Sequence, residues 1–189
     1  MIETIALLII ALLTGIAVKY ADIIEDNENK KRKAEIKKTN RLKNKLELIK
    51  IFLGLIYGIL LFSAIAINES ILPLWVGIVI GLIIIGKIDG LSHYVGVSTF
   101  FALLFLRGYS KFNAILLIIF IAVCVLEEIV NDYFDKHKIK NKKLRKFVAA
   151  RPLLEITALI ASIVTGNWLL WFALLFVDIG YVGTANLAK

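Results

Sequence analysis

Long apolar stretches recur along the whole chain and are separated by short polar connections. An α-helix of about 20 apolar residues crosses a hydrocarbon core of about 30 Å. The chain is therefore predicted to be an all-α, polytopic membrane helix bundle of about seven transmembrane helices. These helices are predicted at residues 2–22, 47–67, 71–88, 92–107, 112–134, 147–165 and 168–186.

The connections between these stretches are too short to hold a second domain, so residues 1–189 are predicted to form a single integral membrane domain. The stretch 92–107 is the shortest and carries polar residues such as Ser98 and Thr99. If this stretch is re-entrant, the number of spans and the orientation of the later helices change.

Composition supports a membrane protein. The hydrophobic content is 59% and the mean hydropathy is +0.82, whereas an ordinary soluble domain is about half apolar. Cys124 is the single cysteine, which excludes a disulfide framework and a thiolate metal site. One Met and abundant Lys are typical of heat-adapted proteins. We therefore expect a multi-pass protein of the cell membrane of an archaeal or similar thermophilic prokaryote.

Basic residues gather in two loops. Eleven Lys or Arg lie in residues 19–50 and seven in 136–146, which together make 18 of the 23 in the chain. The loops at about 27–46 and 136–146 are therefore predicted to be cytoplasmic by the positive-inside rule, with the N-terminus outside and the C-terminus inside. The net charge of +8 is then mainly a topology signal. Nucleic-acid binding is not expected, although the first loop can also contact anionic lipid headgroups.

Carboxylates lie where several of the apolar stretches end. Asp22, Asp89, Asp132 and Asp178 each follow such a stretch or lie late within it. The odd-numbered stretches all run in the same direction, so these aspartates are predicted to lie near one face of the bundle. Ionisable groups at membrane depth are costly and mark functional sites.

The fifth stretch ends in the densest group of acids. Glu128, Asp132 and Asp135 share one helical face at i, i+4, i+7 spacing, with Glu127 and Asn131 on the adjacent stripe. Like charges repel, so a divalent cation, a proton or a basic partner must neutralise them. Oxygen ligands of this kind suit Mg²⁺ or Mn²⁺. The candidate metal ligands are Asp22, Asp26, Asp89, Glu127, Glu128, Asn131, Asp132, Asp135 and Asp178.

Three residues are candidates for catalysis. Arg151 and Glu155 lie one helical turn apart after the second basic loop. An arginine there can bind phosphate in bidentate fashion, and the alternative is an internal ion pair between the two residues. His93 follows a turn at Gly90 and is either a proton carrier or ligand, or a turn residue without a chemical role.

A family resemblance adds to this picture. Residues 131–135, NDYFD, and the sequence Arg151-Pro152-Leu153 resemble motifs of the UbiA superfamily of intramembrane prenyltransferases. The resemblance implies that aspartates hold Mg²⁺ against the diphosphate of a polyprenyl donor. It also implies a second aspartate motif four helices away, a place that Asp22 and Asp26 occupy here, although before NDYFD instead of after it.

Two function classes follow. The first is an intramembrane, Mg-dependent transferase acting on a phosphorylated or diphosphorylated (prenyl) lipid, with a cytoplasm-facing acidic site. The alternative is a small cation or proton transporter that uses the same carboxylates. The expected partners are membrane lipids and an isoprenoid (di)phosphate. The sequence leaves oligomeric state open, because the Gly54–Gly58 GxxxG motif fits a helix contact between subunits or within one.

Overall fold

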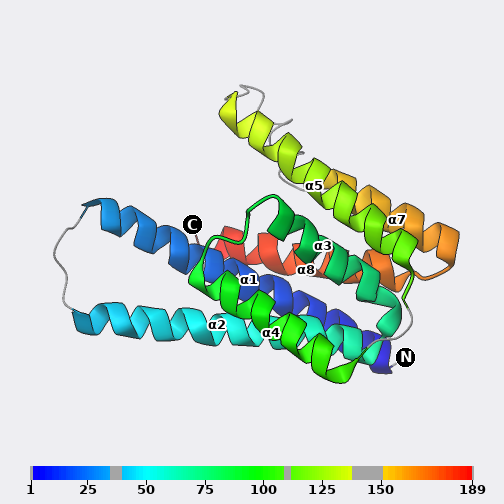
Figure 1. Ribbon diagram of the computed structural model, residues 1–189, viewed down its shortest axis with the longest axis horizontal. Helices are drawn as coiled ribbons and strands as arrows, with labels where there is room; N and C mark the ends of the chain where they lie inside the picture. Colours follow the sequence, from blue (N-terminus) through cyan, green and yellow to red (C-terminus); the bar gives the residue numbers. More distant parts are fainter. Residues whose placement is uncertain (1, 35–39, 109–111, 138–150, 189) are drawn as a thin grey trace. The chain divides into compact units, whose positions relative to one another are not determined.

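The computed structural model describes residues 2–34, 40–108, 112–137 and 151–188 (Figure 1). Every regular element in these residues is a helix, which confirms the predicted all-α class. The elements are α1 (Ile2–Ala34), α2 (Asn40–Ile67), the 3₁₀ helix η1 (Glu69–Ile71), α3 (Leu72–Ile84), α4 (Leu91–Arg107), α5 (Ala114–Lys136), α7 (Pro152–Thr165) and α8 (Leu169–Leu187).

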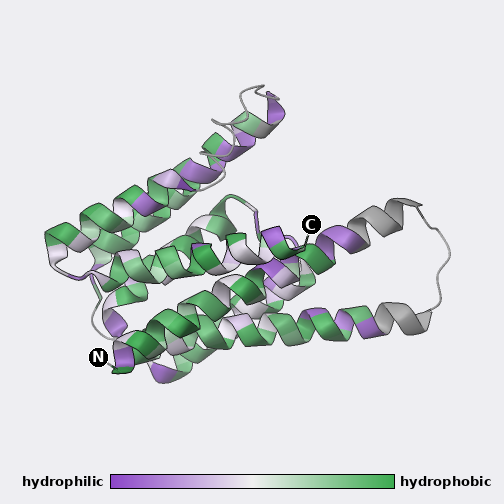
Figure 2. Ribbon diagram, turned by 180° about the vertical axis from the view of Figure 1, so that it is seen from behind, coloured by the Kyte–Doolittle hydropathy of each residue, from purple (hydrophilic) through white to green (hydrophobic). Residues whose placement is uncertain are grey.

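Within the described residues, four helical segments are long and apolar enough to cross a membrane. Figure 2 shows hydrophobic residues along most of each helix, as expected for a helical membrane protein. The predicted total of seven spans stays a prediction, because the remaining apolar helices are shorter. The four long segments are Ile2–Asn27, Lys45–Ile67, Ala114–Phe134 and Leu169–Leu187, and the shorter ones are Glu69–Ile84, Leu91–Arg107 and Pro152–Thr165.

Helix ends differ from the predicted ones for local reasons. Helix α1 was predicted to end at residue 22 but continues to Ala34, because residues 23–34 hold no Gly or Pro and are rich in good helix formers such as Lys and Glu. Helix α3 ends at Ile84 instead of residue 88. Gly86 adopts φ 71° there, a left-handed conformation that glycine adopts without strain, and it turns the chain out of the helix.

The chain divides into two compact units. The first unit contains α1, most of α2, α4 and the second part of α8. The second unit contains η1, α3, α5, α7 and the first part of α8. The prediction of a single domain stays a prediction. The first unit comprises Met1–Ala66, Asp89–Tyr109 and Phe176–Lys189, and the second comprises Ile67–Ile88 and Ser110–Leu175.

Small residues bring helices of the first unit close together. A Cβ atom at Gly58 would overlap with the backbone oxygen of Gly96 on α4, and one at Gly54 would meet the backbone of the same helix. Gly15 on α1 and Gly180 on α8 allow an equally close approach of those two helices. The GxxxG motif therefore serves a contact within the chain, as small residues commonly do between membrane helices.

The second unit is built on the packing of α3 against α5, which run side by side (Figure 1). Gly77 and Gly81 of α3 face Phe120 and Cys124 of α5, so a Cβ at either glycine would crowd those side chains. Cys124 is buried and its thiol donates to the carbonyl oxygen of Ile78 at 3.5 Å. Its surroundings are those of a packing residue.

Candidate functional site

An acid–base cluster lies in the first unit and consists of Lys19, Asp22, Tyr57, His93 and Tyr181. Its centre is the pair formed by His93 and Asp22, in which Nε2 lies 2.9 Å from Oδ1. The hydroxyl of Tyr57 lies 3.4 Å from the other ring nitrogen, Nδ1. Both nitrogens of the imidazole therefore have a partner, which fixes the orientation of the ring.

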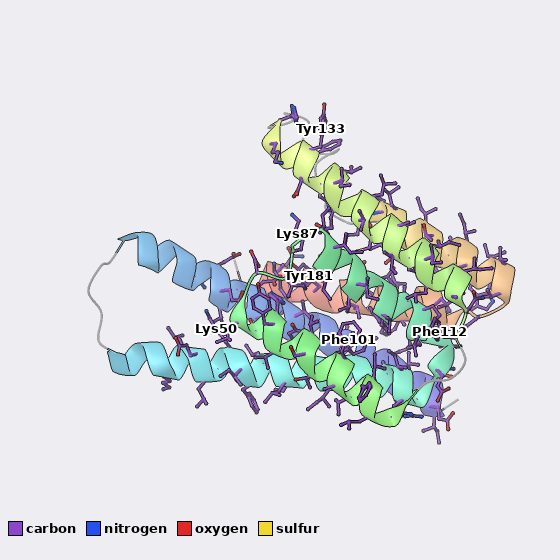
Figure 3. The ribbon with its side chains drawn as sticks, in the orientation of Figure 1. Lys50, Lys87, Phe101, Phe112, Tyr133 and Tyr181 are labelled. Carbon is purple, nitrogen blue, oxygen red and sulfur yellow. The ribbon has the colours of Figure 1, made fainter. Side chains whose placement is uncertain are left out.

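The second carboxylate oxygen of Asp22 is also held. The Tyr181 hydroxyl donates to Oδ2 at 2.5 Å, and the Lys19 ammonium donates to the same hydroxyl at 3.1 Å. Lys19 also lies 3.7 Å from Asp22 Oδ2 and 4.4 Å from the centroid of the Tyr181 ring. The result is a series of polar groups that runs from Lys19 through Tyr181 and Asp22 to His93 (Tyr181 is labelled in Figure 3).

Local structure explains how α4 presents His93. Glu25 lies one turn beyond Asp22 on α1, and its Oε1 accepts hydrogen bonds from the Ser92 backbone N–H at 2.9 Å and from the Ser92 hydroxyl. A carboxylate here satisfies a backbone donor at the start of α4 that has no partner within the helix. Gly90 makes room for it, because a Cβ atom at this position would overlap with the Glu25 carboxylate.

The charge state of His93 follows from its neighbours. The side chains of His93 and Asp22 are 15% and 23% exposed. Burial lowers the pKa of His93, but the hydrogen bond and charge of Asp22, with the charges of Glu25 and Asp89, outweigh burial, so the pKa is raised. The pair is therefore a place where a proton is held strongly. His93 itself lies outside the four long apolar helices.

An ionic cluster lies in the second unit and consists of Lys87, Glu128, Asp132 and Arg151. Lys87 follows α3 (Figure 3) and lies 2.5 Å from Asp132 and 3.8 Å from Glu128. Arg151 Nη2 lies 3.4 Å from Glu128. A divalent cation, a proton or a basic partner can neutralise the acids of α5. In the described residues, Lys87 and Arg151 are basic partners of Glu128 and Asp132.

Glu127 has a different environment from that of Glu128. Its side chain is 2% exposed, and its two oxygens accept the backbone N–H groups of Leu153 at 2.9 Å and Leu154 at 3.0 Å. Glu127 thus caps the N-terminus of α7, where the partial positive charge of a helix favours an anion. Pro152 occupies the start of this helix, where its missing N–H is tolerated.

Of the other predicted site residues, Asp89 acts on the acid–base cluster through its charge, which contributes to the raised pKa of His93. Glu155 accepts the indole N–H of Trp171 at 2.9 Å, which ties α7 to α8. Asp26 and Asp89 are exposed, and Asn131 and Asp178 are half-buried. The side chain of Asp135 lies outside the part of the chain that the structure describes.

Several of the predicted ligands of Mg²⁺ or Mn²⁺ already have partners in the structure. Glu127, Glu128 and Asp132 are engaged by backbone N–H groups or by cations, and Asp22 is engaged by His93 and Tyr181. Within the described ranges, no three His, Cys, Asp or Glu side chains are grouped as a metal ion requires. Mg²⁺ binding stays a prediction.

Sequence reasoning missed several members of these clusters. Tyr57 and Tyr181 are the hydroxyl partners of His93 and Asp22, and Lys19 and Lys87 are the ammonium partners of the aspartates. A signal existed for the lysines, because each lies three residues or fewer from a predicted site aspartate. The same signal existed for Tyr181, which lies three residues after Asp178. Tyr57 gave no comparable signal, since an aromatic residue in an apolar helix usually packs.

Comparison with protein-family models, with curated proteins and with solved structures finds no match for this chain. The class of the protein therefore rests on its own features. Its long apolar helices define a helical membrane protein, and its two clusters place titratable groups next to cations in each unit.

Proposed function

We propose that the protein is an intramembrane enzyme, a transferase that acts on a phosphorylated or diphosphorylated (prenyl) lipid at the cytoplasmic face of the cell membrane. The observation that carries this proposal is that both clusters adjoin the basic loops. The acid–base cluster includes Asp22 on the part of α1 that leads into the first loop. The ionic cluster includes Asp132, just before the second loop, and Arg151, just after it. An enzyme that takes its substrate from one leaflet is expected to have its reactive groups on that side of the membrane.

The acid–base cluster supplies the proton chemistry. The acceptor hydroxyl takes the place of the Tyr57 hydroxyl at Nδ1 of His93, since the Tyr57 hydroxyl also lies within hydrogen-bond distance of the Ser92 and His93 carbonyl oxygens. Nδ1 of neutral His93 then accepts the proton of the acceptor hydroxyl, while the oxygen of that hydroxyl forms a bond to the lipid carbon that carries the phosphate. The (di)phosphate leaves with the electron pair of the broken bond. Asp22, at 2.9 Å, orients the ring and stabilises the imidazolium that forms, as in other carboxylate–histidine pairs.

The ionic cluster, within the second unit, offers positive charge that can bind a phosphate group. Arg151 and Lys87 are 38% and 37% exposed, and a guanidinium matches the geometry of phosphate oxygens. A phosphate would share both cations with Glu128.

A proton transporter is the second candidate function. The polar series from Lys19 through Tyr181, Asp22 and His93 to Tyr57 favours it, because neighbouring groups lie 2.5–3.4 Å apart. Such a series can pass a proton from one group to the next. In this alternative, Arg151 has no chemical role.

Two variants distinguish the candidates. Purified protein in detergent is supplied with polyprenyl diphosphates and acceptor lipids, and the same protein in liposomes is assayed for proton flux. If the protein is a transferase, lipid turnover should fall by about 10²-fold or more in His93→Gln. Turnover should also fall in Arg151→Lys, because the bidentate fork of the guanidinium is lost. Proton flux that needs His93 but survives Arg151→Lys, without lipid turnover, would contradict the transferase and favour the transporter.

A further inference from the structure

An exposed apolar groove of about 400 Å³ lies on α2 in the first unit. Its lining residues are all hydrophobic and all belong to this helix: Leu48, Ile49, Ile51, Phe52 and Leu55. Leu48 and Phe52 are 68% and 62% exposed, and from Leu48 to Leu55 the groove extends about 10 Å along the helix. Helix α2 packs against α4 through its other side, where Gly54 and Gly58 meet the α4 backbone. The groove is therefore not used for packing between these two helices.

A lysine lies at one end of the groove. Lys45 is three residues before Leu48 and seven before Phe52 in α2, a spacing that places the three residues on one face of the helix. Lys45 is exposed, and no acid among the described residues pairs with it. Glu47 is the nearest acid along the helix, but residues two positions apart do not face each other. This face of α2 thus combines one cation with an apolar groove.

The position of Lys45 relative to the membrane span fits an amphiphile. Lys45 is the first residue of the apolar segment Lys45–Ile67, which is long enough to cross a bilayer. The ammonium group is therefore expected in the headgroup region, which lysine side chains reach readily, and the groove begins about 5 Å deeper along the helix. Residues 30–45, which lead into this segment, contain nine Lys or Arg. Basic clusters beside a membrane span attract anionic lipids.

We propose that this face of α2 binds one anionic phospholipid of the surrounding leaflet. The phosphate group accepts hydrogen bonds from the Lys45 ammonium, and one acyl chain lies along Leu48, Phe52 and Leu55. Charge complementarity selects an anionic headgroup, because a zwitterionic one brings its own cation next to the phosphate. The site differs from a general attraction of the basic loop to the membrane surface, since it holds one lipid and needs both the lysine and the groove.

The test uses the full chain in detergent, titrated with dioleoylphosphatidylglycerol, with bound lipid counted by native mass spectrometry. We expect one bound lipid per chain, and weaker binding of dioleoylphosphatidylcholine. Lys45→Gln should weaken phosphatidylglycerol binding about fivefold, the factor for one lysine beside an anionic lipid, and Lys45→Arg should retain it. Lys136→Gln is the matched control, because Lys136 is also exposed and lies two residues beyond another apolar segment, Ala114–Phe134.

A second pair of variants tests the groove. Phe52→Ala should weaken binding severalfold, because apolar contact with the acyl chain is lost. Ile59→Ala should leave binding unchanged, because Ile59 lies on the same helical face seven residues further on but does not line the groove. Both side chains are exposed, so neither substitution removes a buried packing residue.

Four outcomes would overturn the proposal. Equal binding of the two lipids, or equal weakening by Lys45→Gln and Lys136→Gln, would leave only a general attraction between charges. Equal effects of Phe52→Ala and Ile59→Ala would exclude the groove. A dimer of the unmodified protein that is lost in Phe52→Ala would assign the groove to a second copy of the chain. These measurements need no lipid turnover or proton flux, so their result is separate from that of the proposed transferase.

Discussion

His93 and Asp22 form a pair whose energetics depend on pH. The carboxylate raises the pKa of His93 against the opposing effect of burial, so the folded protein holds this proton more tightly than the unfolded chain. The pair therefore stabilises the fold fully below the ordinary histidine pKa of about 6.5. That contribution is lost as the pH rises through the raised pKa of the folded state.

We therefore expect the unfolding temperature in detergent to fall as the pH rises above about 6.5. His93→Gln should flatten this dependence. The exposed residue His137 is the only other histidine, so His137→Gln should leave the dependence as it is in the unmodified protein. A pH dependence that persists in His93→Gln would contradict the assignment.

Tyr181→Phe tests the hydroxyl on the other side of Asp22. The change removes a hydrogen bond of 2.5 Å but keeps the ring beneath Lys19. We expect a loss of about 1 kcal/mol of unfolding free energy, the usual value for one hydrogen bond. Tyr94→Phe is the control, because Tyr94 is 57% exposed. Equal effects of the two variants in an unfolding titration would argue against the bond.

At the scale of elements, the start of α7 depends on a residue of α5. Glu127 is 2% exposed and accepts two backbone N–H groups of α7. Glu127→Ala leaves these donors buried without their partner, so we expect a loss of about 1–3 kcal/mol of unfolding free energy. Hydrogen exchange at Leu153 and Leu154 should accelerate. Asp26→Ala, an exposed acid of α1, should change neither measurement.

The acids of α5 allow a direct test of the Mg²⁺ prediction. If the ion binds there, calorimetry should show binding in the unmodified protein and a loss in the Glu128→Gln/Asp132→Asn double variant. In the structure these carboxylates form ion pairs with Lys87 and Arg151. Identical cation binding in the two proteins would exclude this part of α5 as the metal site.

At the scale of the whole molecule, the basic loops predict the orientation in the membrane. A cysteine introduced at Ser110 should react with an impermeant reagent from outside, and one at Lys143 from inside, because 18 of 23 basic residues lie in two loops. Native Cys124 is 1% exposed and is replaced by Ala to remove background. Labelling of both positions from the same side would refute the orientation.

The sequence by itself determined the class of the fold and the places where ionisable residues gather. An apolar stretch long enough to cross a bilayer is a local property, so the helices could be predicted from the pattern alone. Helix ends were predicted less well. The end of α3, for example, depends on the left-handed turn at Gly86.

Tertiary structure decided which acid meets which base. Asp22 and Tyr181 are 159 positions apart, and Lys87 and Asp132 are 45 apart; no periodicity along one helix encodes such a pairing. The rotation and packing of neighbouring helices set it, through close approaches such as that of Gly15 on α1 to α8. Repulsion among the acids of α5 required a neutralising partner, and only the packed chain could supply Lys87 and Arg151 at 2.5–3.8 Å.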